Sequence, residues 1–258
     1  MKKLNLFLTA MIGLFFAQVD AMQVIPTFPI DQEAAKQEAF FKDGNSFAQA
    51  EANFRKKYSH LNIPSILLVD PIKHPLTGLD MGMDVAYHPN LHKILSESRK
   101  VSQTDEKAFE WLMLHETGHA QYPKIVPSIR YGALGLEGLT AYFWGIHKSK
   151  PYKNILTKVG SKFLGTIAVG MLLSTNLCKA EERRADNFAN KHADAQALQG
   201  GIKWLSDREK INKIILPIVL PGVPDCIRQF LNDPLHPSFD SRIAKCQKAL
   251  KSRFGIDA

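Results

Sequence analysis

The segment HETGH at residues 115–119 constrains the fold more than any other feature of this chain. Residues four positions apart lie on the same face of an α-helix, so the two histidines can bind one cation if the segment is helical. The residues before it favour a helix: Thr104 can cap it, Asp105 and Glu106 suit its first turn, and apolar side chains recur at helical spacing. We therefore expect a helix that begins near Thr104 and carries both histidines.

His115 and His119 in this arrangement are typical metal ligands, and zinc is the metal that suits them. Two neutral imidazoles and one carboxylate leave the fourth coordination position to water, whose pKa zinc lowers to about 7. Glu116 projects beside that position, where it can accept the proton of the water and pass it to a leaving amine. The motif therefore predicts one catalytic zinc ion with Glu116 as the general base.

A second acidic cluster, EERRAD at residues 181–186, lies downstream in sequence that predicts a helix. Glu182 and Asp186 are one helical turn apart, so one can bind the metal while the other holds a ligating histidine. Glu181 is the alternative ligand, but the spacing to Asp186 favours Glu182. Such a run by itself is typical of a solvated, ion-paired helix face, and the preceding HETGH changes that interpretation.

The order of these motifs resembles a known family. HExxH, then ExxAD, then His-Pro followed by Arg-Ile is similar to the zinc gluzincins that include the CAAX prenyl proteases and the HtpX-type membrane heat-shock protease. Here the second motif is ERRADNFA from Glu182 onward, and the third lies in LHPSFDSRI, with His236-Pro237 and Arg242-Ile243. The resemblance extends over about residues 60–247.

The resemblance implies a zincin-like metalloprotease fold and a role for each matching residue. These roles are zinc binding by His115, His119 and Glu182, general base catalysis by Glu116, donation to the oxyanion of the tetrahedral intermediate by His236, and support of the site by Asp186 and Arg242. The chain departs from the family at Thr117, where an apolar residue is usual. It also lacks an evident Asn-Ala segment near residues 70–85, where the substrate-binding edge strand is expected.

The rest of the chain predicts a mainly helical α+β fold. Residues 31–60 carry aromatic side chains at helical spacing and predict a helix that is interrupted near Asp43-Gly44. Residues 65–69 (SILLV) and 83–87 (MDVAY) predict two strands of a small antiparallel sheet beside the HETGH helix. We divide the chain into a targeting segment at 1–21, an N-terminal helical segment at 22–60 and a zinc metalloprotease domain at 61–258.

Residues 1–21 predict a signal peptide, because two lysines precede an apolar run of the appropriate length. The alternative is an uncleaved N-terminal anchor. Both interpretations place the rest of the chain outside the cytoplasm, in the periplasm or cell envelope. There Cys226 and Cys246 can form a disulfide or remain two separate thiols, and Cys178 is expected to be a small buried hydrophobe.

Two apolar stretches, at 125–146 and 163–178, leave two interpretations open. A membrane hairpin would place the lysine-rich loop between them in the cytoplasm and both acidic motifs on the other side. Glu137 would then lie within the membrane, and the second stretch is short for a span. A buried or interfacial helix pair fits the modest hydropathy better, and it favours a soluble or peripherally membrane-associated protein.

The formal net charge of +8 is a local feature of the chain. Seven lysines lie at positions 2, 3 and within 148–162, and the remaining 26 basic residues nearly balance 25 acidic ones. Basic residues interleaved with aromatic residues, which single-stranded nucleic acid binding requires, are not evident. We therefore expect protein or peptide substrates and no nucleic acid partner.

Together these features predict an exported zinc-dependent endopeptidase, a hydrolase that cleaves peptide bonds. Processing or quality control of cell-envelope proteins is the role that the resemblance implies. The alternative is a catalytically silent, zinc-stabilised chaperone or scaffold protein of the cell envelope. The combination of Glu116 and His236 argues against this alternative, because a silent protein needs neither a general base nor an oxyanion donor.

Overall fold

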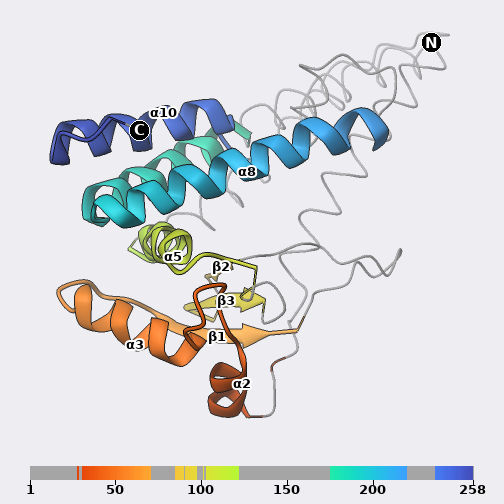
Figure 1. The fold of residues 1–258 in the computed structure, drawn as a ribbon, viewed down its shortest axis with the longest axis vertical. Coiled ribbons are helices and arrows are strands. Elements are labelled where there is room, and N and C mark those ends of the chain that lie inside the picture. Colours follow the sequence, from red (N-terminus) through yellow and green to blue (C-terminus); the bar gives the residue numbers. More distant parts are fainter. Residues whose placement is uncertain are drawn as a thin grey trace, which may run out of the picture.

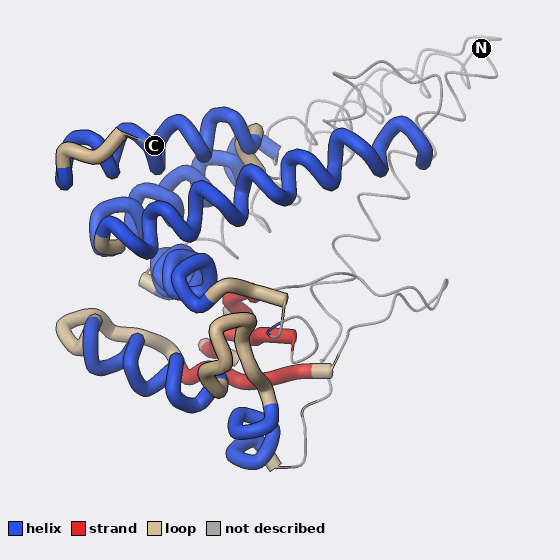
Figure 2. Tube along the Cα trace, in the orientation of Figure 1, coloured by secondary structure: helices blue, strands red, loops and turns tan. Residues whose placement is uncertain are grey.

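The structure is a computed structural model that describes residues 28, 31–70, 85–89, 91–97, 101, 103–121, 175–219 and 236–257. This part of the chain is mainly helical and includes one three-stranded sheet (Figures 1 and 2). Several predictions concern segments outside the described residues. These are the signal peptide at 1–21, the apolar stretch at 125–146, most of the stretch at 163–178, the lysine-rich loop and Cys226.

The N-terminal segment forms two short helices, α2 (Gln32–Glu38) and α3 (Phe47–Lys57). The predicted interruption is confirmed, because Gly44 takes a φ of 83°, a left-handed conformation that glycine adopts without steric cost. Ser46 starts α3 with a capping box: the Ser46 side chain accepts from the backbone N–H of Gln49, and the Gln49 side chain accepts from the backbone N–H of Ser46. Local signals therefore define both ends of the break.

The sheet consists of β1 (Ser65–Val69), β2 (Val85–His88) and β3 (Lys93–Glu97), in the order β1-β3-β2. β3 pairs with β2 antiparallel and with β1 parallel, so the prediction of an antiparallel sheet is wrong and the sheet is mixed. β3 was not predicted, because only two of its five residues are large and apolar. Because β3 is the central strand of the sheet, Ser96 and Glu97 are also buried. Polar residues such as these give no sign of burial in the sequence.

Helix α5 (Glu106–Ala120) confirms the predicted HETGH helix, although Asp105 rather than Thr104 caps it. The Asp105 side chain accepts from the backbone N–H of Lys107 at 2.8 Å. Figure 1 shows α5 between the sheet and the C-terminal helices, and nearly every residue of α5 is therefore buried. The helix that carries both histidines is thus the central element of the fold.

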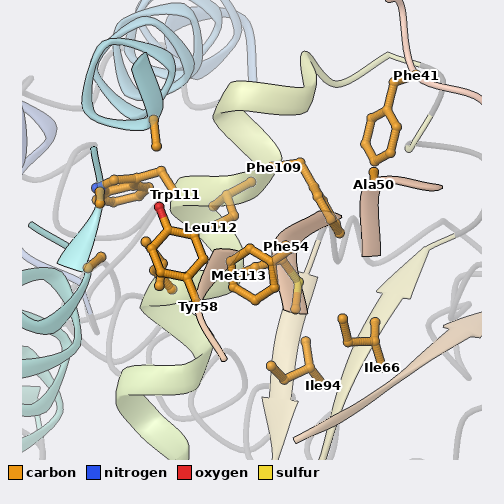
Figure 3. Packing of buried hydrophobic residues seen from close by; sticks show 14 of the residues in the cluster. Phe41, Ala50, Phe54, Tyr58, Ile66, Ile94, Phe109, Trp111, Leu112 and Met113 are labelled. Atoms are coloured by element: carbon orange, nitrogen blue, oxygen red, sulfur yellow. The ribbon is translucent and has the colours of Figure 1, made fainter. Parts of the chain in front are cut away.

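The C-terminal part contains helical residues 175–192, α8 (Ala195–Val219) and α10 (Phe239–Phe254). α8 packs against both α5 and α10. One hydrophobic core includes residues of α3, the sheet, α5, α8 and α10, so the N-terminal helical segment shares its core with the rest of the protein (Figure 3). Among the described helices, none is both long and apolar enough to cross a membrane.

Cys246 and Cys178 are both buried, as expected for Cys178. The Cys246 thiol is not part of a disulfide and instead donates to the side-chain oxygen of Asn190 at 3.2 Å. Burial raises the pKa of this thiol to about 12, so it stays protonated and unreactive at neutral pH. Of the two possibilities that the sequence leaves open for Cys246, the structure has the reduced thiol.

Candidate metal centre

Helix α5 packs against helical residues 175–192 at the HETGH segment. Gly118 is the point of closest approach, since a Cβ atom there would lie 3.0 Å from Cα of Ala185 and from Cβ of Phe188. Thr117 is fully buried, and its hydroxyl donates to the carbonyl of Met113 at 2.7 Å. This bond explains how a polar residue can be buried at this position, because the hydroxyl is satisfied within its own helix.

The atoms expected to bind metal converge on one point between these helices. Nε2 of His115 lies 3.2 Å from Nε2 of His119. The Glu182 carboxylate faces both rings, with Oε2 at 3.2 Å from Nε2 of His115 and Oε1 at 3.5 Å from Nε2 of His119. A tetrahedral zinc site with metal–nitrogen distances of about 2.05 Å separates its ligand atoms by about 3.3 Å. The three side chains therefore have the spacing of ligands to one ion.

A buried oxygen points to the same conclusion. Oε2 of Glu182 is buried and accepts no hydrogen bond of regular geometry from any described residue, although the Nε2 atoms of His115 and His236 lie 3.2 and 3.3 Å away. A buried carboxylate oxygen in this condition costs free energy unless a cation is near it. The donor set of two imidazoles and a carboxylate suits zinc, so the residues fit the metal that the sequence predicts.

His115, Glu116 and His119 form a group that can hold a metal ion, since one ligand atom from each lies within 4.8 Å of the others. Glu116 is nevertheless the more distant carboxylate, with Oε1 at 3.9 Å from Nε2 of His115. Its other oxygen, Oε2, accepts a hydrogen bond from the backbone N–H of Tyr87 at 2.6 Å. We regard Glu182 as the better third ligand because it lies nearer to both imidazoles, and Glu116 lies beside the centre where a base is needed.

Each histidine has a carboxylate at its other ring nitrogen. Nδ1 of His115 lies 3.0 Å from Oδ1 of Asp186, and Nδ1 of His119 lies 3.1 Å from Oε1 of Glu181. These contacts favour the tautomer with hydrogen on Nδ1, which leaves the lone pair of Nε2 for a metal. Glu181 and Asp186 both come from helical residues 175–192, so this helix orients both imidazoles.

Arg242 joins α10 to this arrangement, as the sequence predicts for a residue that supports the site. Its guanidinium binds the Asp186 carboxylate through Nε at 3.0 Å and a terminal nitrogen at 2.8 Å. Asp186 and Arg242 are almost completely buried, so water weakens this bidentate ion pair little. The pair holds Asp186 in place against His115.

The electrostatics of the centre favour bound cations. Burial by itself would lower the pKa of His115, but the neighbouring carboxylates of Asp186 and Glu182 raise it. Burial would raise the pKa of Glu182, but His236, His119 and His115 lower it well below its usual value. Burial would also raise the pKa of Asp186, but His115 and Arg242 lower it to about 2. Both carboxylates therefore remain charged at neutral pH.

His236 lies at the open side of the centre. Its Nε2 is 3.3 Å from Oε2 of Glu182, and its side chain is 37% exposed, far more than the other side chains at this point. The structure thus brings together all seven residues that the sequence singled out. They are His115, Glu116, His119, Glu182, Asp186, His236 and Arg242.

Sequence reasoning missed three contributors to the site. Glu181 was considered as a ligand but contacts the far nitrogen of His119, and only its position next to Glu182 could have indicated this. Trp111 precedes His115 by one helical turn and stacks on its ring. The backbone N–H of Tyr87 bonds Glu116, and no side-chain pattern reveals a backbone donor.

No protein-family model matches the chain, and neither a curated protein nor a solved structure is significantly similar to it.

Proposed function

We propose that this protein is a zinc-dependent endopeptidase of the gluzincin type, with His115, His119 and Glu182 as the zinc ligands. The observation that carries the proposal is the spacing of the ligand atoms: the two Nε2 atoms lie 3.2 Å apart, and each lies 3.2 or 3.5 Å from one oxygen of the Glu182 carboxylate, close to the spacing in a tetrahedral zinc site. The ordered motifs HExxH, ExxAD and His-Pro with Arg-Ile support the same proposal. An exported protein of the cell envelope, soluble or peripheral to the membrane, remains the proposed setting.

A zinc ion supplies Lewis acidity to such a centre and lowers the pKa of water to about 7. Glu116 acts as the general base, since one carboxylate oxygen faces the histidines while the Tyr87 N–H holds the other. It takes the proton of the attacking water and delivers it to the departing amine. Asp186 and Glu181 keep both imidazoles in the ligating orientation.

His236 donates to the oxyanion that forms when water adds to the peptide carbonyl. Its partial exposure and its position beside Glu182 support this role, because a substrate carbonyl can approach the centre only from an accessible side. The pairing of Asp186 with Arg242 stabilises the negative charge near His115 and holds the Asp186 carboxylate beside Nδ1 of that histidine.

The decisive experiment is hydrolysis of casein by the Glu116→Gln variant. We expect the rate to fall by at least about 100-fold, because an amide cannot accept the proton, whereas bound zinc stays at the wild-type level. Glu33→Gln in the exposed part of α2 is the matched control and should leave the rate unchanged. A chelator should abolish the wild-type activity, and added Zn²⁺ should restore it.

The same assay distinguishes an enzyme from a zinc-stabilised chaperone or scaffold. An undiminished rate in Glu116→Gln would contradict the mechanism. Wild-type protein that contains stoichiometric zinc but hydrolyses no peptide substrate would favour the silent scaffold instead.

A further inference from the structure

Trp111 is the largest fully buried side chain next to the metal centre. It lies one helical turn before His115 on α5, and its indole stacks on the imidazole with ring centroids 5.7 Å apart and an interplanar angle of 23°. The two rings are therefore nearly parallel along the same face of the helix. Figure 3 shows that Trp111 points to the side of α5 that faces the C-terminal helices.

Three C-terminal helices hold this indole in place. Its Nε1–H donates to Oδ1 of Asn190 at 3.0 Å, and the Cys246 thiol of α10 donates to the same oxygen at 3.2 Å. Gly201 of α8 lies against the ring, since a Cβ atom there would come within 2.6 to 2.9 Å of three indole carbons. The Arg242 guanidinium lies 5.7 Å from the ring, within cation–π range.

His115 needs such support because its contact with Asp186 restrains the ring plane only loosely. Nδ1 lies 3.0 Å from Oδ1 of Asp186 but makes no hydrogen bond of regular geometry with any described residue, so the imidazole can still swing over a limited range about its Cβ–Cγ bond. A parallel aromatic surface restricts that rotation, because turning the ring would bring it into the indole. The Asp186 carboxylate beside Nδ1 and the Trp111 indole against the ring face together orient Nε2 of His115 toward His119 and Glu182.

We propose that Trp111, anchored by Asn190, is a positioning residue that sets the plane of His115 for metal binding. This inference rests on the proposed function, since it assigns a role toward the zinc ion of that centre. It assigns no contact with the substrate, so Trp111 is not a catalytic residue. The site would then depend on the docking of α8 as well, because Gly201 of α8 lies against this indole.

The test measures the affinity of the full chain for Zn²⁺, by competition with a chromogenic chelator, in four variants. Trp111→Phe keeps an aromatic face but loses the N–H donor, and Trp111→Leu loses both. Asn190→Ala keeps the indole and removes its anchor. Trp204→Leu is the matched control, because Trp204 lies half-buried on α8 and contacts Arg208 rather than the metal centre.

We expect Trp111→Leu to weaken zinc binding by about 10- to 100-fold, the effect typical of removing support behind a ligand. Trp111→Phe and Asn190→Ala should weaken zinc binding less than Trp111→Leu does. Trp204→Leu should bind zinc within about twofold of the wild type. The visible absorption of the Co²⁺-loaded protein should change in both Trp111 variants and remain unchanged in Trp204→Leu, because it reports ligand geometry rather than stability.

Wild-type zinc affinity and an unchanged Co²⁺ spectrum in folded Trp111→Leu would overturn the inference, as would an equal loss in Trp204→Leu. If Trp111→Leu does not fold, Trp111→Phe and Asn190→Ala decide, and wild-type affinity in both overturns it. Failure of the proposed function is separately visible, since it would appear as absent zinc binding or absent peptide hydrolysis in the wild type.

Discussion

Glu181 and Glu182 are neighbours in the sequence but contact different atoms of the centre. Glu182 faces the Nε2 atoms of both histidines, whereas Glu181 faces Nδ1 of His119. We predict that Glu182→Ala abolishes stoichiometric zinc binding, because it removes a ligand. Glu181→Ala should weaken zinc affinity by about 10-fold or somewhat more, because it removes only the orientation of His119. Chelator competition measures both values.

Glu181→Gln provides the control for this comparison, since an amide oxygen can still accept from Nδ1 of His119. It should recover most of the affinity that Glu181→Ala loses. Zinc binding that survives in Glu182→Ala but disappears in Glu181→Ala would reverse the assignment and make Glu181 the ligand.

Among the elements, the contact between α5 and helical residues 175–192 depends on Gly118. Replacing glycine by alanine within a helix usually stabilises a protein by about 0.5–1 kcal/mol. At Gly118 we predict the opposite sign, a loss of about 1–3 kcal/mol, because the new methyl group would meet backbone atoms of Ala185 at 3.0 to 3.2 Å. Denaturant unfolding of Gly118→Ala measures this change.

Gly118→Ala should also bind zinc more weakly, because separating α5 from helical residues 175–192 moves Glu182 away from both histidines. Stability equal to or above that of the wild type would show that the helices adjust without cost. It would then refute the view that glycine is required at the contact.

Sequence signals were most informative where they are local to one element. α5 could be predicted because a capping residue, a first-turn acid and apolar spacing all lie within a few residues of HETGH. The break between α2 and α3 followed from Asp43-Gly44 for the same reason. β3 could not be found in this way, since its polar residues are buried only through pairing with strands on both sides.

The candidate metal centre also combines what one helix defines with what only the packing of two helices defines. The i, i+4 spacing of the histidines, and of Glu182 with Asp186, defined which residues share a helical face. It did not define how two helices dock, and that docking decides that Glu182 rather than Glu181 faces the imidazoles. The need for a carboxylate ligand and the ordered resemblance to gluzincins both indicate that the two motifs belong together, but neither defines the contact between the helices.

At the scale of the whole molecule, a bound ion would link α5 to helical residues 175–192, because its ligands come from both helices. We predict that removing zinc with a chelator lowers the melting temperature by roughly 5–10 °C, when the free zinc of the loaded sample is about 100 times its dissociation constant. The reason is that the ion binds the folded chain, in which α5 and helical residues 175–192 are docked, and not the unfolded chain. Differential scanning calorimetry measures the shift.

The double variant His115→Ala, His119→Ala is the control, because it lacks both imidazoles. Its melting temperature should not respond to the chelator. A shift of the same size in this variant would mean that the chelator acts elsewhere on the protein.

The ion pair between Asp186 and Arg242 joins residues that are 56 positions apart. The chain is synthesised from its N-terminus, so HETGH and the EERRAD segment emerge long before Arg242 does. Until α10 has followed, Asp186 lacks its guanidinium partner and Trp111 lacks the Cys246–Asn190 contact behind it. The contacts behind His115 are therefore complete only after the C-terminal helix, the last one synthesised, has docked.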